Sequence, residues 1–193
     1  MTLKNVVQIA VLAVIGFALG MAVGLLTMFM GVVALYISSG LSALAVGPAF
    51  VIMARKIRKR GAAFLFWVIY GLLHAAMGYW IMIPVYLVAG LLSEWIIGGY
   101  DNPRRIGFSF GVSMFLVSLL PIALVKIIGA QSIANLHTGF TPERASMIFA
   151  AYTWQVILIS ILVNIVLVAL GAWLGILIND KFFEKKKKQS ILE

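Results

Sequence analysis

The sequence predicts an all-α integral membrane protein with six transmembrane helices and both termini in the cytoplasm. This prediction rests on long apolar runs, few charges between them and a one-sided distribution of basic residues. Hydrophobic residues make up 63% of the 193 residues, charged residues only 11%, and the mean hydropathy is +1.10. A soluble domain carries about 25% charged residues. A chain this apolar could not bury its nonpolar surface within itself, so soluble enzymes and nucleic-acid-binding proteins are excluded.

Each expected span is an apolar run bounded by charges or by turn-forming residues, and a helix needs about 20 such residues to cross about 30 Å of hydrocarbon. The first run, 5–55, is too long for one crossing, so we place a break at its Ser- and Gly-containing stretch 36–40. A turn at Gly78, Tyr79 and Trp80 separates the third span from the fourth. No linker or repeat divides the chain, which predicts one domain over residues 1–193 with spans at 5–36, 41–54, 62–79, 82–97, 106–128 and 152–178.

The basic residues orient these spans. With the amino terminus inside, only Lys126 and Arg144 of the 15 Lys and Arg residues fall on the outer side. Cytoplasmic loops carry such an excess of Lys and Arg, so the net charge of +9 is first a topology signal. The lysine run 185–188 can in addition attract anionic membrane lipid.

The longest stretch outside the spans is the outer loop 129–151. Within it, Thr141 is a helix N-cap residue, Pro142 suits the first helical position, and Glu143 adds an acid to the first turn. We therefore predict a short helix at 142–151. A loop of this length in a compact protein is usually functional, so we interpret it as a lid over a binding site; a plain connector between helix ends is the alternative.

Polar and aromatic residues gather at the same outer end and form the candidate substrate site. His74 lies about 20 Å from the inner face at 1.5 Å per helical residue, and polar groups at such depth usually face the protein interior. A hydrogen bond between helices is the alternative for His74. For Tyr79, Trp80 and Trp154 the alternative is an aromatic belt at the lipid headgroups or packing in the core. The predicted substrate-binding residues are His74, Tyr79, Trp80, Asn135, His137, Tyr152, Trp154 and Gln155.

Small residues on the first span predict close contact with another helix. Gly16 and Gly20 lie on one face, and Ala18 and Ala22 lie on the opposite face. Lipid gives helices no hydrophobic drive to associate, so small residues that permit close approach mark helix interfaces. One face can serve the chain's own bundle and the other a second protein, which makes all four residues partner-binding candidates; internal packing of both faces is the alternative.

Several kinds of chemistry have no residues to carry them. There is no cysteine, no G-x-x-x-x-G-K-[ST] phosphate-binding loop, no H-E-x-x-H and no pair of intramembrane carboxylates. Glu94 is the only acid inside a span, and we expect it to reach the inner face or pair with a basic loop. We therefore expect no catalytic residues, no metal site, no cofactor and no enzyme, but a binding protein that relies on an energised partner for any transport.

Five short motifs follow one another along nearly the whole chain: the basic loop 55–60, the turn 78–80, Gly-Leu-Leu-Ser-Glu at 90–94, Gly-Ala-Trp-Leu-Gly at 171–175 and Lys-Phe-Phe-Glu-Lys at 181–185. By these motifs the chain resembles the substrate-binding S components of energy-coupling factor (ECF) transporters, and within that group it is similar to the Trep_Strep-type family.

The resemblance implies an S-component-like bundle of six helices in a prokaryotic plasma membrane. Its ligand would be a vitamin or similar micronutrient, bound near the outer ends of the last three helices. Its partners would be a transmembrane coupling subunit, which docks on an A-x-x-x-A motif such as Ala18/Ala22, and two cytoplasmic ATPases. The aromatic, weakly charged candidate site suits a pterin, a flavin-like ring or a tetrapyrrole. A structural or regulatory membrane subunit without a small-molecule ligand is the alternative.

Overall fold

The computed structural model describes residues 1–30, 33–129 and 141–184, and over these residues the chain is helical without strands. This confirms the predicted all-α class. The elements in chain order are α1 (Leu3–Met28), α2 (Ala34–Ile57), α3 (Ala62–Ala76), the 3-10 turn η2 (Trp80–Met82), α4 (Ile83–Ile97), α5 (Pro103–Ile128), α7 (Pro142–Ala151), α8 (Trp154–Ile178) and the π-helical turn η3 (Asn179–Glu184).

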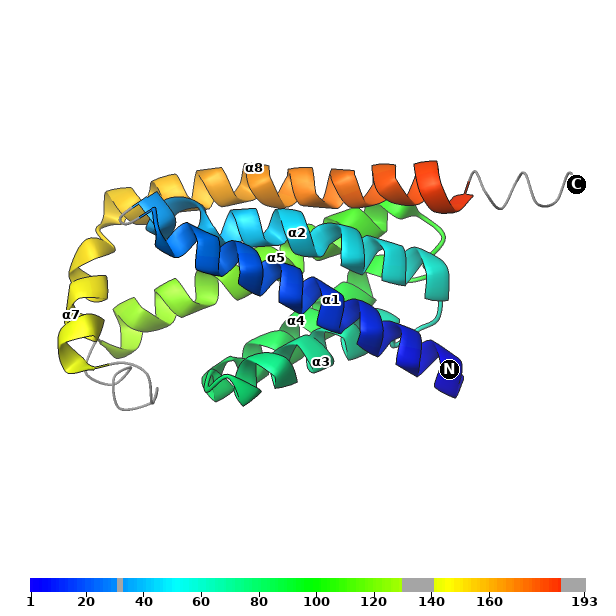
Figure 1. Ribbon diagram of the computed structural model, residues 1–193, viewed down its shortest axis with the longest axis horizontal. Helices are drawn as coiled ribbons and strands as arrows, with labels where there is room; N and C mark the ends of the chain where they lie inside the picture. Colours follow the sequence, from blue (N-terminus) through cyan, green and yellow to red (C-terminus); the bar gives the residue numbers. More distant parts are fainter. Residues whose placement is uncertain (31–32, 130–140, 185–193) are drawn as a thin grey trace, which may run out of the picture.

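The long helices lie side by side in one elongated bundle (Figure 1). α2 packs against α1 and α8, α3 pairs with α4, and α5 lies between α4 and α8. The amino terminus and the end of α8 lie at the same end of the bundle, and the short helix α7 crosses the other end (Figure 1). α7 occupies the range that the Thr-Pro-Glu signal predicted, 142–151.

The break after the first helix is not where the sequence placed it. α1 ends at Met28 and α2 begins at Ala34, so the stretch 36–40 is helical. Ser38 accepts a hydrogen bond of 3.0 Å from Thr27 Oγ1, and Ser39 donates one of 2.7 Å to Asn164 Oδ1. In an apolar bundle these serines serve as contacts between helices rather than as turn formers, which is why the composition misled the prediction.

The other helix limits lie within a few residues of the expected spans. The turn after α3 is present at Gly78, where φ is 93°, and α5 begins at Pro103 rather than at 106. By length and apolarity, four helical segments of the described chain can cross a membrane: Leu3–Thr27, Ile37–Ile57, Trp80–Ile97 and Trp154–Phe183. α3 is apolar but only 15 residues long. The count of six crossings stays a prediction.

A seam of glycines joins α2 to α8, and we call it the α2–α8 seam (Gly40, Gly47, Gly171 and Gly175). A Cβ added at Gly47 would lie 2.5 Å from the carbonyl oxygen of Gly171, and one added at Gly171 would lie 2.6 Å from that of Ala43. Only hydrogen fits between backbones this close. The seam therefore fixes α2 against α8.

The core beside this seam is aromatic. Phe50, Phe66, Trp67 and Phe110 are fully buried, and their ring centroids lie 5.2–6.3 Å apart. Trp67 Nε1 donates a hydrogen bond of 2.8 Å to Ser93 Oγ, so the one polar atom of this indole is paired. α2, α3, α4 and α5 are held together by this cluster.

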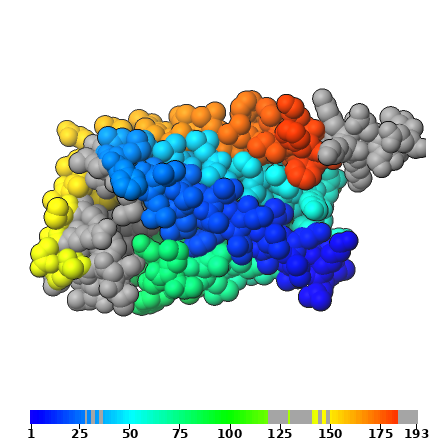
Figure 2. Space-filling model, viewed as in Figure 1, coloured from blue at the N-terminus to red at the C-terminus, as the bar shows by residue number. Residues whose placement is uncertain are grey.

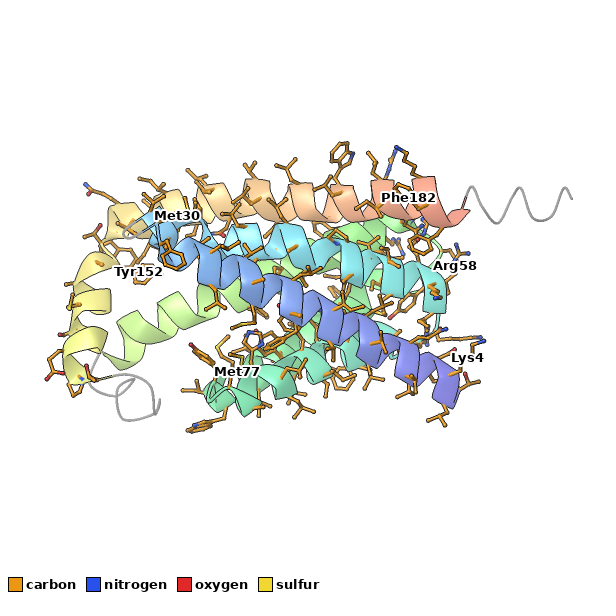
Figure 3. All side chains as sticks on the ribbon, in the orientation of Figure 1. Lys4, Met30, Arg58, Met77, Tyr152 and Phe182 are labelled. Atoms are coloured by element: carbon orange, nitrogen blue, oxygen red, sulfur yellow. The ribbon has the colours of Figure 1, made fainter. Side chains whose placement is uncertain are left out.

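Most of the described basic side chains gather at one end of the bundle, which we call the basic end (Lys4, the loop 55–60, Arg104, Arg105 and Lys181). Figure 3 shows Lys4, Arg58 and Phe182 together at this end. Arg55 forms an ion pair of 3.2 Å with Asp180 and thereby joins the end of α2 to η3. The turns after α1 and α3 and the helix α7 form the opposite end. This arrangement agrees with the alternation of basic and neutral loops along the sequence.

Candidate functional site

Glu94 lies at the basic end, where it stabilises the start of α3. Its Oε1 accepts hydrogen bonds from the backbone N–H groups of Ala63 (2.8 Å) and Phe64 (3.1 Å) and from the hydroxyl of Tyr100. A carboxylate at a helix N-terminus satisfies free N–H groups and complements the helix dipole. Burial, and then the hydrogen bond to Glu94, raise the pKa of Tyr100. Of the two expected alternatives, reaching the inner face or pairing with a basic loop, the second does not describe these bonds: Glu94 lies at the basic end but binds backbone and a tyrosine.

His74 lies in the last turn of α3, half-buried, with both ring nitrogens engaged. Nδ1 lies 3.0 Å from the carbonyl oxygen of Tyr70, and Nε2 lies 3.3 Å from the hydroxyl of Tyr86. A carbonyl oxygen can only accept, so Nδ1 carries the proton, and the neutral ring accepts at Nε2 from the Tyr86 hydroxyl. His74 therefore links α3 to α4, the alternative that the sequence left open beside ligand contact.

Aromatic rings surround this histidine and form what we call the His74 cluster (Phe17, Tyr70, His74, Tyr79 and Tyr86). The ring of His74 lies 4.8 Å from Phe17, 5.0 Å from both Tyr70 and Tyr86, and 6.4 Å from Tyr79, measured between centroids. Exposure rises along the cluster from 3% at Tyr86 to 37% at Tyr79. The cluster thus leads from the core to the surface near the α3–α4 turn, where Trp80 is 51% exposed.

The remaining predicted site residues lie just before α8, on α8 or outside the described residues. Tyr152 is half-buried just before α8, and burial raises the pKa of its phenol. Trp154 is 74% exposed, and Gln155 is also exposed. Figure 3 shows Tyr152 at the junction of α7 and α8, apart from the α3–α4 turn that Met77 marks. Asn135 and His137 lie outside the described residues.

The four small residues of α1 separate into an inner and an outer pair. A Cβ added at Gly16 would lie 3.3 Å from Ala49, and one added at Gly20 would lie 2.8 Å from the hydroxyl of Tyr70. Gly16 and Gly20 are thus buried against α2 and α3 and are not free to contact a partner. Ala18 and Ala22 are exposed. Figure 2 shows in blue that α1 lies at the surface of the bundle.

A groove that the sequence analysis missed runs between α5 and α8. Its volume is about 560 Å³, and its walls extend from Arg104 to Phe115 on α5 and from Ile165 to Ile176 on α8. The groove exists because Gly107 and Gly111 place no side chain on this face of α5. A Cβ added at Gly107 would already lie 3.1 Å from Ile176. The four-residue spacing of these glycines was a usable signal, but the opposing wall comes from a helix 50 or more residues away in sequence.

Comparison with known proteins gives a family but no characterised relative. A family model described as a hypothetical bacterial integral membrane protein (Trep_Strep) matches residues 3–185. Comparison with curated proteins and with solved structures found no significant match.

Proposed function

The chain belongs to the Trep_Strep family of bacterial integral membrane proteins, and on that premise we propose that it is the substrate-binding S component of an ECF-type importer. In this role it binds a vitamin or other micronutrient at the end opposite the basic end and works with a coupling subunit and two cytoplasmic ATPases. The absence of a phosphate-binding loop from the sequence supports a division of labour in which partners supply the energy.

The His74 cluster is the observation that carries this proposal. It is an aromatic path with a polar inner end, and its outermost members, Tyr79 and the neighbouring Trp80, are exposed. Exposed aromatic faces stack on flat rings, while hydroxyl and imidazole groups hydrogen-bond ring heteroatoms. This supports a flat heterocycle such as a pterin, a flavin-like ring or a tetrapyrrole as the ligand, bound without catalysis.

The outer face of α1 supports a membrane partner. Ala18 and Ala22 are exposed beside larger exposed residues such as Ile15, Leu19 and Leu25. The two alanines are smaller than these neighbours, and small residues permit the backbone of a second helix to come close. The coupling subunit is proposed to bind at Ala18 and Ala22.

Extraction in a mild detergent, followed by mass spectrometry of small molecules and of co-purified proteins, tests both the proposed ligand and the proposed partners. We expect a retained heterocycle and an ATPase pair with a coupling subunit. Ala18→Trp is expected to abolish co-purification of the partners and to spare the retained ligand, whereas Leu162→Trp, at an exposed position on α8, is the matched control and should spare both. Normal assembly of the Ala18→Trp variant would show that the partner uses another surface.

A structural or regulatory subunit without a ligand is the second candidate. It is favoured by the complete internal pairing of His74, which needs no ligand to satisfy its nitrogens. Partners without any retained small molecule, from cells supplied with rich medium, would favour this candidate over the S component.

A further inference from the structure

We propose that the groove between α5 and α8 binds one anionic phospholipid, with the headgroup phosphate on Arg104 and one acyl chain lying along the groove. The proposal does not involve the lysine run 185–188, which lies outside the described residues. The inference stands whether or not the chain is an S component, since it depends only on the surface of these two helices.

The length of the groove matches one leaflet of a bilayer. Its walls span twelve residues on each helix, from 104 to 115 and from 165 to 176, and the eleven rises of 1.5 Å between the two ends make about 16 Å. Half of a hydrocarbon core of about 30 Å is about 15 Å. The groove begins at the basic end and stops near the middle of α8, so an acyl chain that enters from the headgroup level fills it.

The chemistry of the walls selects an amphiphile. Apart from Arg104, every lining residue is apolar, and among them Phe108 and Trp173 are 66% and 55% exposed. Exposed apolar rings beside a groove in a membrane-spanning chain meet acyl chains rather than water. The groove therefore offers hydrocarbon contacts over its length and a single cation at its mouth.

The charge of Arg104 selects an anionic headgroup. Among the described residues, no carboxylate lines the groove. Arg104 is exposed, and no acidic side chain in the described part of the chain forms an ion pair with it. A guanidinium binds phosphate oxygens through paired, charge-assisted hydrogen bonds. The neighbouring basic residues of the basic end add a field that favours lipids with net negative charge.

Native mass spectrometry of the full chain, titrated with phosphatidylglycerol or phosphatidylcholine, tests the headgroup. We expect phosphatidylglycerol to bind more tightly, and Arg104→Gln to weaken its binding about ten-fold, as expected for loss of a charge-assisted hydrogen bond. Arg105→Gln is the matched control, because Arg105 is the next residue, is exposed and does not line the groove; a change below two-fold is expected. Equal losses in both variants, or equal affinity for the two lipids, would overturn the proposal.

Filling the groove tests the acyl-chain part. A Cβ added at Gly111 would meet only Val168, at 3.8 Å, so Gly111→Leu is expected to fold with its side chain in the groove. It should reduce phosphatidylglycerol binding at least five-fold, while Gly24→Leu, where a Cβ meets nothing within 4 Å, should leave it unchanged. Wild-type lipid binding by a folded Gly111→Leu variant would refute a lipid in this groove. So would a photoreactive residue placed at position 108 that cross-links to a polypeptide instead of to lipid.

Discussion

The α2–α8 seam and the His74 cluster are both helix contacts inside one apolar bundle, yet they are built from opposite materials. The seam brings backbone onto backbone, with no room for one carbon atom at Gly47 or Gly171. The cluster packs rings against one another, edge-on for Phe17 and Tyr79 and tilted for Tyr70 and Tyr86, with centroids 4.8–6.4 Å from His74. The seam is formed by residues without side chains, whereas the cluster is formed by large aromatic side chains.

The difference indicates which region is scaffold and which can respond to a ligand. A backbone contact is either made or broken, because neither helix can give way by rotating a side chain. The cluster ends in exposed side chains, and its hydrogen bond between His74 and Tyr86 joins two side chains rather than backbone atoms. We infer that the seam holds the bundle while the α3–α4 side adapts.

The largest effect is expected at the seam, where Gly171→Val should prevent folding or cost about 3 kcal/mol or more, at the upper end of overpacking costs. The added Cβ would lie 2.6 Å from the carbonyl oxygen of Ala43 and 3.0 Å from the Cα of Leu44, and neither atom can move alone. Thermal unfolding in detergent measures the loss. Gly24→Val is the control, because nothing lies within 4 Å of its added Cβ. Equal stability of the two variants would show that the helices can separate cheaply.

Next comes His74→Ala in the cluster, with an expected loss of about 1–3 kcal/mol, the cost of leaving a buried polar group unpaired. The buried hydroxyl of Tyr86 loses its acceptor in this variant. Tyr86→Phe removes the same bond from the other side, so the double variant should cost clearly less than the sum of the single losses. Strictly additive losses in thermal unfolding would mean that the two side chains stabilise the bundle independently.

The sequence predicted local features of the fold better than contacts between distant helices. Gly78 and the Thr141–Pro142–Glu143 signal act within a few residues, and the turn and α7 lie where these signals placed them. Ser39 failed as a turn signal because its partner, Asn164, lies 125 residues away.

The candidate site was only partly predictable for the same reason. His74 and Tyr79 contact each other because they flank one turn, whereas Tyr152 and Trp154 lie at the start of α8, a helix whose position no local pattern gives. Helical spacing separated the Gly16/Gly20 face of α1 from the Ala18/Ala22 face, but spacing cannot tell that Gly20 faces Tyr70 while Ala18 faces outward. Pairing of helices supplies that information.

A smaller effect, and one on binding rather than folding, is expected for Trp80→Ala. Trp80 is 51% exposed, so its loss should change the unfolding temperature little. Under the proposed function it should weaken retention of the heterocycle about two- to ten-fold, the range for loss of one aromatic contact. Trp95→Ala is the control, because Trp95 is 81% exposed near the basic end of α4. Equal effects on ligand retention would remove the α3–α4 turn from the site.

The smallest effect is expected for Ser39→Ala beside the seam, about 0.6 kcal/mol, the average for hydrogen bonds between membrane helices. The variant removes the 2.7 Å bond to Asn164, whose Nδ2 still donates to the carbonyl oxygen of Ser160 at 2.6 Å. Unfolding in the same detergent as Gly171→Val makes the two losses comparable. If Ser39→Ala cost as much as Gly171→Val, the polar bond rather than the glycine contact would hold α2 to α8, and the contrast between seam and cluster would fail.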